Sequence, residues 1–315
     1  MKLAKEVDTI DRSSKKYILK QNIKRNWQIY LFLLPMITYF FIFHYVPMYG
    51  VQIAFKNYLP NKGFMGSDFV GLKHFETFFN SYYFWRLLKN TILLNVYGLL
   101  LFPLPVVFAL MLHEVRHAGL KKWMQTITYA PHFISVVVVV GMLVAFLNPQ
   151  TGIVNVALKM VGMEPIYFMA EPGWFRHLYV WSGQWESLGW NTIIFLAALA
   201  GINPELYEAA EVDGASRLQR ILHINIPGIL PTVVILFILN IGMFMQIGFE
   251  KVLLMQNNLN KETSDVIQTF VYNVGLLEGR FSYATAIGLF ESAINIVLLV
   301  TVNQIARKIG ENSLW

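Results

Sequence analysis

Six long apolar stretches, separated by shorter polar segments, dominate the hydrophobic pattern of the chain. They lie near residues 28 to 50, 88 to 113, 123 to 147, 178 to 201, 229 to 250 and 281 to 306. Each has about the twenty residues that a helix needs to cross roughly 30 Å of hydrocarbon. The third contains the β-branched run Val136 to Val140, which fits a helix wherever backbone groups must bond internally. The pattern predicts an all-α membrane protein with six transmembrane helices in one domain, residues 28–306.

The composition supports this prediction and excludes other classes. Hydrophobic residues make up 56% of the chain and charged residues 14%, and the mean hydropathy is +0.48, which is too apolar for an ordinary soluble domain. The chain has no cysteine, so disulfides, thiolate metal sites and thiol catalysis are excluded. The basic residues lie beside the apolar stretches, which argues for membrane orientation and against a nucleic-acid-binding domain.

The distribution of lysine and arginine predicts the orientation of the chain in the membrane. If the N-terminus is cytoplasmic, 15 of the 25 basic residues lie inside, and 8 of them are in residues 1–27. We expect residues 1–27 to be a basic cytoplasmic arm and residues 307–315 a short cytoplasmic tail. The polar segment at residues 202–228 is then cytoplasmic as well.

This cytoplasmic segment carries the signals of a helix start. Asn203 fits an N-cap and Pro204 the first helical position. Glu205 and Glu208 then lie near the positive end of the helix dipole. The sequence predicts a short helix on the membrane surface.

A turn and a second helix are expected to follow. Ala209 and Ala210 leave a helix face without bulk, and Gly214 permits a turn that a side chain would hinder. Residues 215–223 fit a second helix, which we expect Pro227 to end. The protruding first helix is suited to insertion in a partner's groove, where a glutamate can meet an arginine. The alternative is an ordinary connection between two spans.

The same segment carries a spaced motif. Glu208-Ala209-Ala210-Glu211-Val212-Asp213-Gly214 is followed nine residues later by Ile224-Asn225-Ile226-Pro227. This spacing resembles the coupling loop by which permease subunits of type I ATP-binding-cassette importers dock on their ATPase, with Ile226 where the family usually has Leu. The resemblance implies the permease fold with a cytoplasmic coupling helix. It assigns ATPase coupling to Glu208, Ala209, Ala210, Asp213, Gly214 and Arg217.

Further matches, over about residues 20 to 310, resemble the carbohydrate-uptake branch and especially its polysaccharide-type permeases. They include Leu34-Pro35, the run from Phe43 to Gly50, Ala54-Phe55, Val70-Gly71-Leu72, Asn90-Thr91, Glu114-Val115-Arg116, the run from Tyr129 to Ser135, Trp185, Gly189 and the run from Leu196 to Leu199. The resemblance implies ATP-driven import of an oligosaccharide or related sugar by alternating access, in a bacterial cytoplasmic membrane. It implies as partners a second homologous permease, two ABC ATPases, an extracytoplasmic solute-binding protein and membrane lipids, and no nucleic acid.

The chain is not expected to be an enzyme. It has no G-x-x-x-x-G-K-[ST] phosphate loop, so ATP and magnesium are expected in the partner ATPase and no cofactor in this chain. No metal site is expected, since His44 and His132 lie alone on separate apolar stretches, where packing or a hydrogen bond explains them.

Polar and aromatic residues within the last three apolar stretches are candidates for sugar binding, because sugars offer hydroxyls and an apolar ring face. The candidates are Trp185, Glu186, Asn191, Asn240, Met243, Gln246, Glu291 and Asn295. Asn240, Met243 and Gln246 follow steps of three, which keeps them on roughly one helix face. Glu291 lies near the middle of its span, where an ionisable residue is costly. The alternative is that the asparagines and Glu291 bond to other spans, and that the tryptophans form an interfacial belt.

Other functions remain as alternatives. An importer of a non-sugar solute would share the coupling loop. A secondary transporter could use Glu291 as a proton site, but internal repeats and paired broken helices are not evident. A membrane enzyme acting on lipid-linked sugar lacks an H-E-x-x-H motif or compact acidic cluster. The outer loops near 51–87, 148–177 and 251–280 are expected to meet the delivery protein or lie flat on the membrane.

Overall fold

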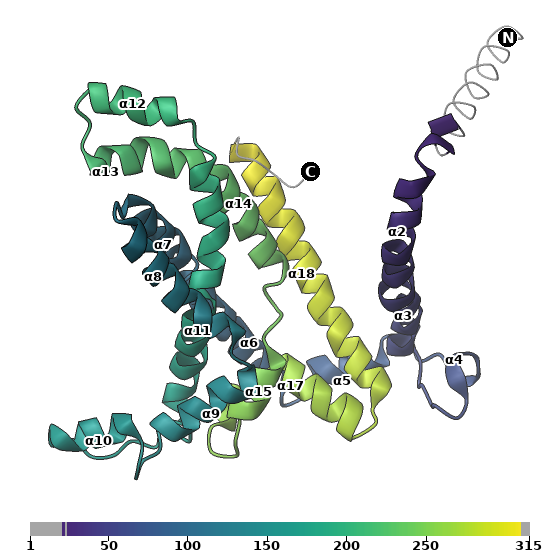
Figure 1. Cartoon of the computed structure of the whole chain (residues 1–315). Helices are drawn as coiled ribbons and strands as arrows, with labels where there is room; N and C mark the ends of the chain where they lie inside the picture. Colours follow the sequence, from purple (N-terminus) through teal and green to yellow (C-terminus); the bar gives the residue numbers. More distant parts are fainter. Residues whose placement is uncertain (1–20, 23, 310–315) are drawn as a thin grey trace, which may run out of the picture.

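The computed structural model describes residues 21–22 and 24–309, and the regular secondary structure of this part of the chain is helical apart from one isolated antiparallel bridge between Lys56 and Phe69 (Figure 1). The predicted all-α architecture is therefore confirmed. Most of the predicted basic arm at 1–27, and of the tail at 307–315, lies outside the described residues.

The elements differ widely in length. The α-helices are α2 (Trp27–Phe40), α3 (Val46–Met48), α4 (Gly63–Gly66), α5 (Lys73–Phe79), α6 (Phe84–Leu100), α7 (Pro103–Glu114), α8 (Ala118–Tyr129), α9 (Val136–Phe146), α10 (Ile153–Met160), α11 (Pro172–Ala200), α12 (Pro204–Val212), α13 (Arg217–Arg220), α14 (Ile226–Gly242), α15 (Phe249–Met255), α16 (Lys261–Ser264), α17 (Ile267–Tyr272) and α18 (Phe281–Ile309). The π-helical segments are η1 (Phe41–Tyr45), η4 (Ile221–Asn225) and η5 (Asn273–Leu277), and the 3₁₀ segments are η2 (Tyr49–Phe55) and η3 (Ala130–Phe133).

Several helices are long and apolar enough to cross a membrane. Within the described residues, four continuous helical runs qualify: Trp27–Phe55, Phe84–Glu114, Arg217–Gly242 and Phe281–Lys308. Two bent pairs also qualify, Ala118–Phe133 with Val136–Phe146 and Pro172–Ala200 with Pro204–Val212, at bends of 100° and 69°. The described chain thus holds four to six spans, and the count of six remains a prediction.

Two of the predicted spans differ from straight helices. The third, expected at 123–147, is broken between η3 and α9, where Ser135 caps the new helix by accepting a hydrogen bond from the Val138 N–H. The fifth, expected at 229–250, ends at Gly242, and α15 begins only at Phe249. The intervening residues 243–248 form an irregular segment, here called the break.

Pro227 does not end the second helix of the cytoplasmic segment, so that expectation was wrong. The helix runs from Arg217 to Gly242 through η4, whose wider turn precedes Pro227 by two residues. Proline has no N–H to donate, and a π turn accommodates the missing bond without interrupting the helix. η1 precedes Pro47 in the same way.

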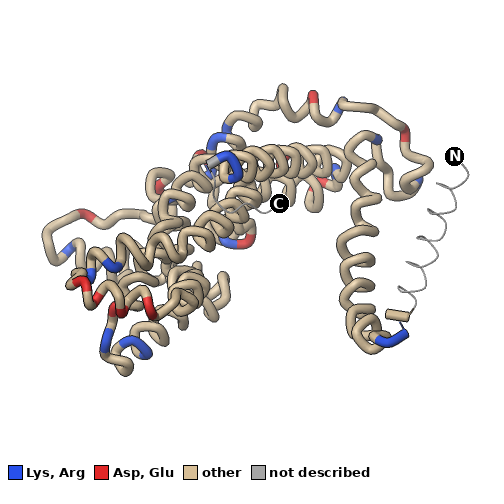
Figure 2. The backbone as a smooth tube through the Cα atoms, turned by 90° about the horizontal axis from the view of Figure 1, so that it is seen from above, with Lys and Arg blue, Asp and Glu red and all other residues tan. Residues whose placement is uncertain are grey.

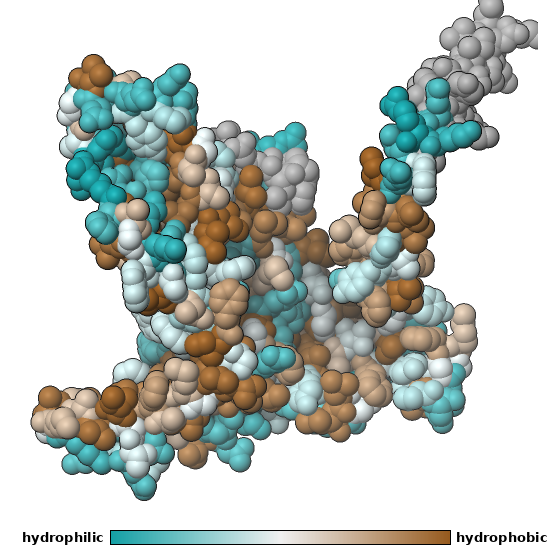
Figure 3. Space-filling model, in the orientation of Figure 1, coloured by the Kyte–Doolittle hydropathy of each residue, from teal (hydrophilic) through white to brown (hydrophobic). Residues whose placement is uncertain are grey.

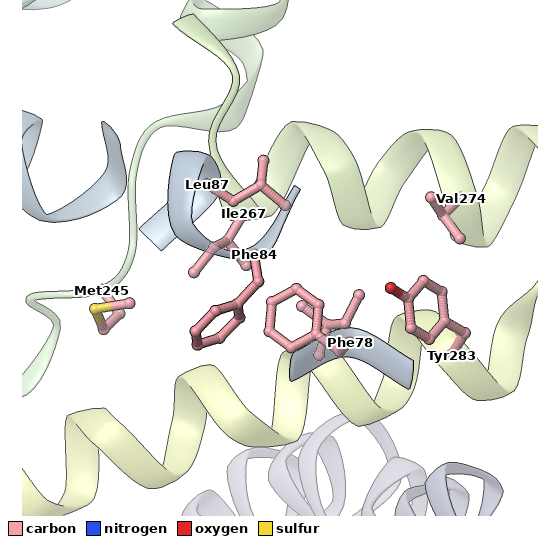
Figure 4. Close-up of a cluster of buried hydrophobic side chains, with 8 residues drawn as sticks. Phe78, Phe84, Leu87, Met245, Ile267, Val274 and Tyr283 are labelled. Carbon is pink, nitrogen blue, oxygen red and sulfur yellow. The ribbon is translucent and has the colours of Figure 1, made fainter. Parts of the chain in front are cut away.

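One of the three buried hydrophobic clusters of the described chain lies between α18 and the shorter helices at the lower end of Figure 1. There the rings of Phe78, Phe84 and Tyr283 lie in one layer with Met245 (Figure 4). The ring centroids of Phe78 and Phe84 are 5.1 Å apart, with an edge-on geometry that aromatic pairs favour. The helix formed by α2, η1 and α3 stands apart from this body (Figure 1), and its residues are exposed. Its apolar surface is not covered within the described chain.

Candidate functional site

The cytoplasmic helix α12 forms as the sequence predicts. The Asn203 side chain caps it by accepting a hydrogen bond from the Glu205 N–H at 3.1 Å, and Pro204 follows at the first helical position. Together with α13 it forms the end of the molecule at the upper left of Figure 1. Seen from that end, residues of both charges gather over this part of the molecule (Figure 2).

Gly214 makes the turn that follows α12. Its φ of 73° is the left-handed conformation that glycine adopts without steric cost. The Ala215 N–H donates to the Ala210 carbonyl at 2.8 Å, and the Gly214 N–H donates to the Glu211 carbonyl at 3.1 Å. This pair of bonds is a Schellman motif, which closes the helix and sets the direction of the chain that follows.

A reciprocal cap begins α13. The Ser216 N–H donates to Gln219 Oε1 at 2.7 Å, and the Gln219 N–H donates to Ser216 Oγ at 3.4 Å. This is a capping box, and the spacing S-x-x-Q was available in the sequence as a signal for it. We call the unit α12–Gly214–α13 the elbow.

The elbow is fastened to the start of the next long helix. Tyr207 Oη donates to Asn225 Oδ1 at 2.6 Å, and Asn225 is fully buried. A Cβ at Gly228 would lie 2.6 Å from Ile202 Cδ1, so the two chain segments are in close contact there. One short hydrogen bond thus joins α12 to η4, and the contact of Ile202 with Gly228 joins the chain just before α12 to the start of α14.

The predicted coupling residues lie on the outside of the elbow. Glu208, Ala209, Asp213, Gly214 and Arg217 are exposed, and Ala210 is half-buried. Exposed apolar side chains flank them, above all Val212 at 89% exposure, with Leu206 and Leu218. In Figure 3 this end of the molecule is largely hydrophilic, with a small apolar spot at its tip.

Three of the predicted sugar-binding residues share one cavity. Asn191 on α11, with Asn240 and Met243 at the end of α14, lines a space of about 430 Å³. Gln184 on α11 lines it too, and the rest of the wall is mostly apolar, including Phe102 and Leu236. A few amides in an apolar wall are the usual composition of a small-molecule site.

Glu186 forms an ion pair instead of facing this cavity. Its Oε2 lies 3.3 Å from Nζ of Lys251, a buried lysine that also lies 5.7 Å from the Tyr179 ring centroid. The pair joins α11 to α15. Lys251 was missed in the sequence because it falls in a segment expected to be an outer loop.

Glu291 and Asn295 hold the break. Asn295 Oδ1 accepts from the Met245 N–H at 2.8 Å, while Gln268 Nε2 donates to the Met245 carbonyl at 2.6 Å and to Glu291 Oε1 at 2.5 Å. Side chains of α17 and α18 thus satisfy both backbone groups of Met245, as buried backbone groups require. Gln268 was not anticipated from the sequence.

The two remaining candidates lie elsewhere. Trp185 lines a separate, mostly aromatic and aliphatic pocket of about 380 Å³ with Trp174 and Trp181. Gln246 is exposed within the break. The eight candidates therefore occupy several environments, and their contact with sugar remains a prediction.

The histidines pack against aromatic rings. His132 stacks on Trp190 with ring centroids 4.3 Å apart, and His44 lies 5.1 Å from the Phe40 ring. Among residues 21–22 and 24–309, no group of three or more His, Asp or Glu could hold a metal ion.

Comparisons with known proteins identify the family. The profile of the family described as "Binding-protein-dependent transport system inner membrane component" matches residues 102–311. Protein LplB of Bacillus subtilis (strain 168) is 45% identical over 93% of this chain and 92% of its own length. The polygalacturonan/rhamnogalacturonan transport system permease protein YteP of the same organism is 43% identical over 96% of this chain and 95% of its own.

A solved structure shares the fold. It is a chain of a bacterial ABC transporter involved in the import of the acidic polysaccharide alginate, which aligns with a TM-score of 0.85 at 43% identity and covers 92% of this chain and 99% of its own. A second crystal structure holds a bacterial alginate ABC transporter in complex with an alginate pentasaccharide-bound periplasmic protein, and its chain aligns with the same TM-score at 42% identity.

Proposed function

The chain belongs to the family of binding-protein-dependent transport system inner membrane components, and we propose that it is the permease subunit of an ATP-driven importer of oligosaccharides. Relatives named for polygalacturonan and rhamnogalacturonan, for arabinooligosaccharides and for alginate support a cargo derived from polysaccharides. The chain spans nearly the full length of these proteins.

The elbow is the observation that carries the coupling role. α12 is exposed on the outside and bears Glu208 and apolar Val212, and the bond from Tyr207 to Asn225 joins its inner side to η4, which continues directly into α14. A conformational change in a partner ATPase bound to α12 thereby moves α14 in the membrane bundle. ATP and magnesium bind in that partner, which performs the hydrolysis.

α14 also connects the elbow to the proposed transport path. α14 runs from the elbow to the cavity of Asn191, Asn240 and Met243, so a displacement of α12 changes the shape of a site that suits sugar hydroxyls. Alternating access then consists of opening this cavity outward when the ATPases close on ATP and inward after hydrolysis. An extracytoplasmic binding protein delivers the sugar.

A second homologous permease completes the path. The uncovered helix α2–η1–α3 offers apolar side chains on all sides and stands away from the body (Figure 1), which fits packing against another membrane chain and lipid. We place this chain in the cytoplasmic membrane as one permease domain of six spans, residues 28–306, with both termini and the 202–228 segment inside.

The coupling role is tested by Glu208→Arg. Reversing the exposed charge opposes the arginine expected in the ATPase groove, so sugar uptake is abolished while the amount of membrane-inserted protein is unchanged. Lys308→Glu, which reverses an exposed charge near the end of α18 and outside the elbow, is the matched control and retains uptake. Undiminished uptake by a well-expressed Glu208→Arg variant contradicts the proposal.

The cavity is tested by Asn240→Ala. Removing one amide that bonds a sugar hydroxyl raises the half-saturating sugar concentration roughly fivefold, corresponding to about 1 kcal/mol. The maximal uptake rate and the assembly of the complex are retained. Uptake kinetics identical to those of the wild type, measured over a full concentration series, remove Asn240 from the binding site.

A further inference from the structure

A polar pocket lies at the end of the molecule opposite the elbow, apart from the cavity of Asn240. It occupies about 390 Å³ between the first turns of α6, the first turns of α11 and α16. Its wall includes Tyr82, Trp85, Lys89, Arg176 and Glu262. No step of the proposed transport cycle has used these residues.

The pocket has an excess of positive charge. Arg86 also lines it, but its guanidinium is neutralised by Asp265 at 3.0 Å. Burial raises the pKa of the Asp265 carboxyl, and the neighbouring Arg86 opposes this shift. Lys89 and Arg176 form no ion pair with any residue that the structure describes. Against these two cations the wall offers one carboxylate, that of Glu262.

Two aromatic rings stand at the rim. Tyr82 is 85% exposed and Trp85 is 74% exposed, although both belong to the wall of a concave site. A flat ring beside a free ammonium group suits a sugar acid, because the sugar ring packs on the aromatic face while its carboxylate meets the cation. Glu262 and the Thr263 hydroxyl add acceptors for sugar hydroxyls.

The floor of the pocket is held rigidly. Asn90 is 2% exposed, and its Nδ2 donates to the carbonyls of Glu262 at 2.8 Å and of Asp265 at 3.0 Å. Its Oδ1 accepts from Arg176 Nη2 at 2.9 Å, while Arg176 Nε is buried without a partner. Arg176 is therefore held in place before a ligand arrives, which lowers the entropy cost of binding.

One helix leads from the pocket to the cavity. Arg176 and Asn191 are fifteen residues apart on α11, which corresponds to about 22 Å along the axis and a rotation of about 60°. The two residues thus face broadly the same side of one continuous helix. The pocket is positioned to meet a sugar before the cavity does.

We propose that this pocket binds the carboxylate of an acidic oligosaccharide, such as a uronic acid oligomer, at the outer mouth of the permease. This inference rests on the proposed function and names the cargo class more closely. A phospholipid headgroup would need only the cations, whereas the exposed rings and the hydroxyl acceptors match a sugar acid. Lys89 supplies the free charge, and Arg176 the charge fixed by Asn90.

Direct binding tests the pocket without relying on transport. The complex is reconstituted in phosphatidylcholine nanodiscs without nucleotide or binding protein, and titrated with trigalacturonate and with a neutral galactose trisaccharide. Trigalacturonate binds more tightly than the neutral sugar. Lys89→Gln weakens trigalacturonate binding roughly ten- to a hundredfold, the loss of one charge-assisted hydrogen bond, and leaves binding of the neutral sugar unchanged. Lys89→Arg retains the preference.

Two further variants separate charge from stacking. Trp85→Ala weakens the binding of both sugars by a similar factor, because an aromatic face packs on a charged and on a neutral sugar ring alike. Lys73→Gln removes an exposed lysine outside the pocket and changes neither affinity. Equal affinity for the two sugars in the wild type, or equal effects of Lys89→Gln and Lys73→Gln, overturns the proposal.

The same nanodisc system distinguishes a sugar-acid site from a lipid site, and a failure of the pocket proposal from a failure of the proposed function. If phosphatidylglycerol in the nanodisc abolishes trigalacturonate binding and native mass spectrometry finds that lipid on the wild type but not on Lys89→Gln, the pocket is a lipid site and the proposal fails. If trigalacturonate binds as expected but no sugar-loaded binding protein stimulates ATP hydrolysis, the proposed function fails while the pocket stands.

Discussion

The elbow and the break are both interruptions of helical structure, but they are built in opposite ways. The elbow is closed by local bonds, such as those of Asn203, Gly214 and Ser216 to residues a few positions away. The break at residues 243–248 is held by side chains that lie 23 and 50 residues beyond Met245 in the sequence. The elbow is thus an exposed unit stabilised by local hydrogen bonds, whereas the break depends on the packing of three helices.

Because of this difference, we expect mutations in the elbow and mutations at the break to have different effects. Changes on the outer face of the elbow should disconnect the partner and leave the bundle folded. Changes around the break should lower stability first, because they leave buried polar groups without partners. Three substitutions test this contrast, and thermal melting of the complex in detergent provides the common measurement.

Lys251→Ala, next to the break, has the largest expected effect. It removes the buried member of the pair with Glu186 and leaves a half-buried carboxylate without its counter-charge, which costs about 3 kcal/mol, the lower end of the range for a buried pair. Tm falls strongly, and little folded complex is recovered. The exposed Lys261→Ala is the control and melts as the wild type does.

A double variant sharpens the interpretation of this result. Glu186→Gln with Lys251→Met removes both charges, so much of the lost stability returns. If Lys251→Ala alone melts like the wild type, the ion pair contributes no stability. The prediction that changes near the break lower Tm more than changes in the elbow is then wrong for this pair.

Asn295→Leu has an intermediate effect. The Met245 N–H loses its acceptor in a buried position, which costs about 1–3 kcal/mol. Tm falls by less than in Lys251→Ala. Ser292→Ala, one turn away on the exposed side of α18, serves as the control. A melting curve equal to that of Ser292→Ala would show that water or lipid replaces the amide and that the break does not need it.

Tyr207→Phe has the smallest effect on stability and tests the inner side of the elbow. It removes the bond to Asn225, at a cost of about 1 kcal/mol, the low end of the range because the bond is only partly buried, and loosens α12 from η4. The sugar transported per ATP hydrolysed falls, although the fold is kept. The exposed Tyr167→Phe provides a control. Unchanged coupling would show that the packing of Gly228 on Ile202 suffices to connect the elbow.

The sequence predicted the elbow well because its signals are local. Asn203, Pro204 and Gly214 act on their own neighbours, so their effects can be read without knowledge of the tertiary structure. Pro227 was misinterpreted because a π turn, η4, absorbs its missing N–H within a continuous helix. Propensity alone does not distinguish a helix end from such a turn.

The intramembrane candidates were predicted less completely because their partners are distant in the sequence. Asn191, Asn240 and Met243 meet in one cavity, as a shared binding site requires. Glu186 is instead engaged by Lys251, and Glu291 by Gln268, two partners that lie in segments expected to be outer loops. Those segments are folded as the short helices α15 and α17. Hydropathy could not place them, since the short helices are ordered by packing.

ATP hydrolysis by the intact complex tests the central claim most directly. The complex is purified through a tag on this chain, reconstituted in lipid, and assayed with its binding protein, empty or loaded with a panel of neutral and acidic oligosaccharides. We expect loaded binding protein to stimulate hydrolysis in the wild type and to have no effect on Glu208→Arg. The absence of an associated ATPase from a folded wild-type sample, or equal stimulation of the Glu208→Arg complex, would contradict the assignment of the elbow as the coupling site.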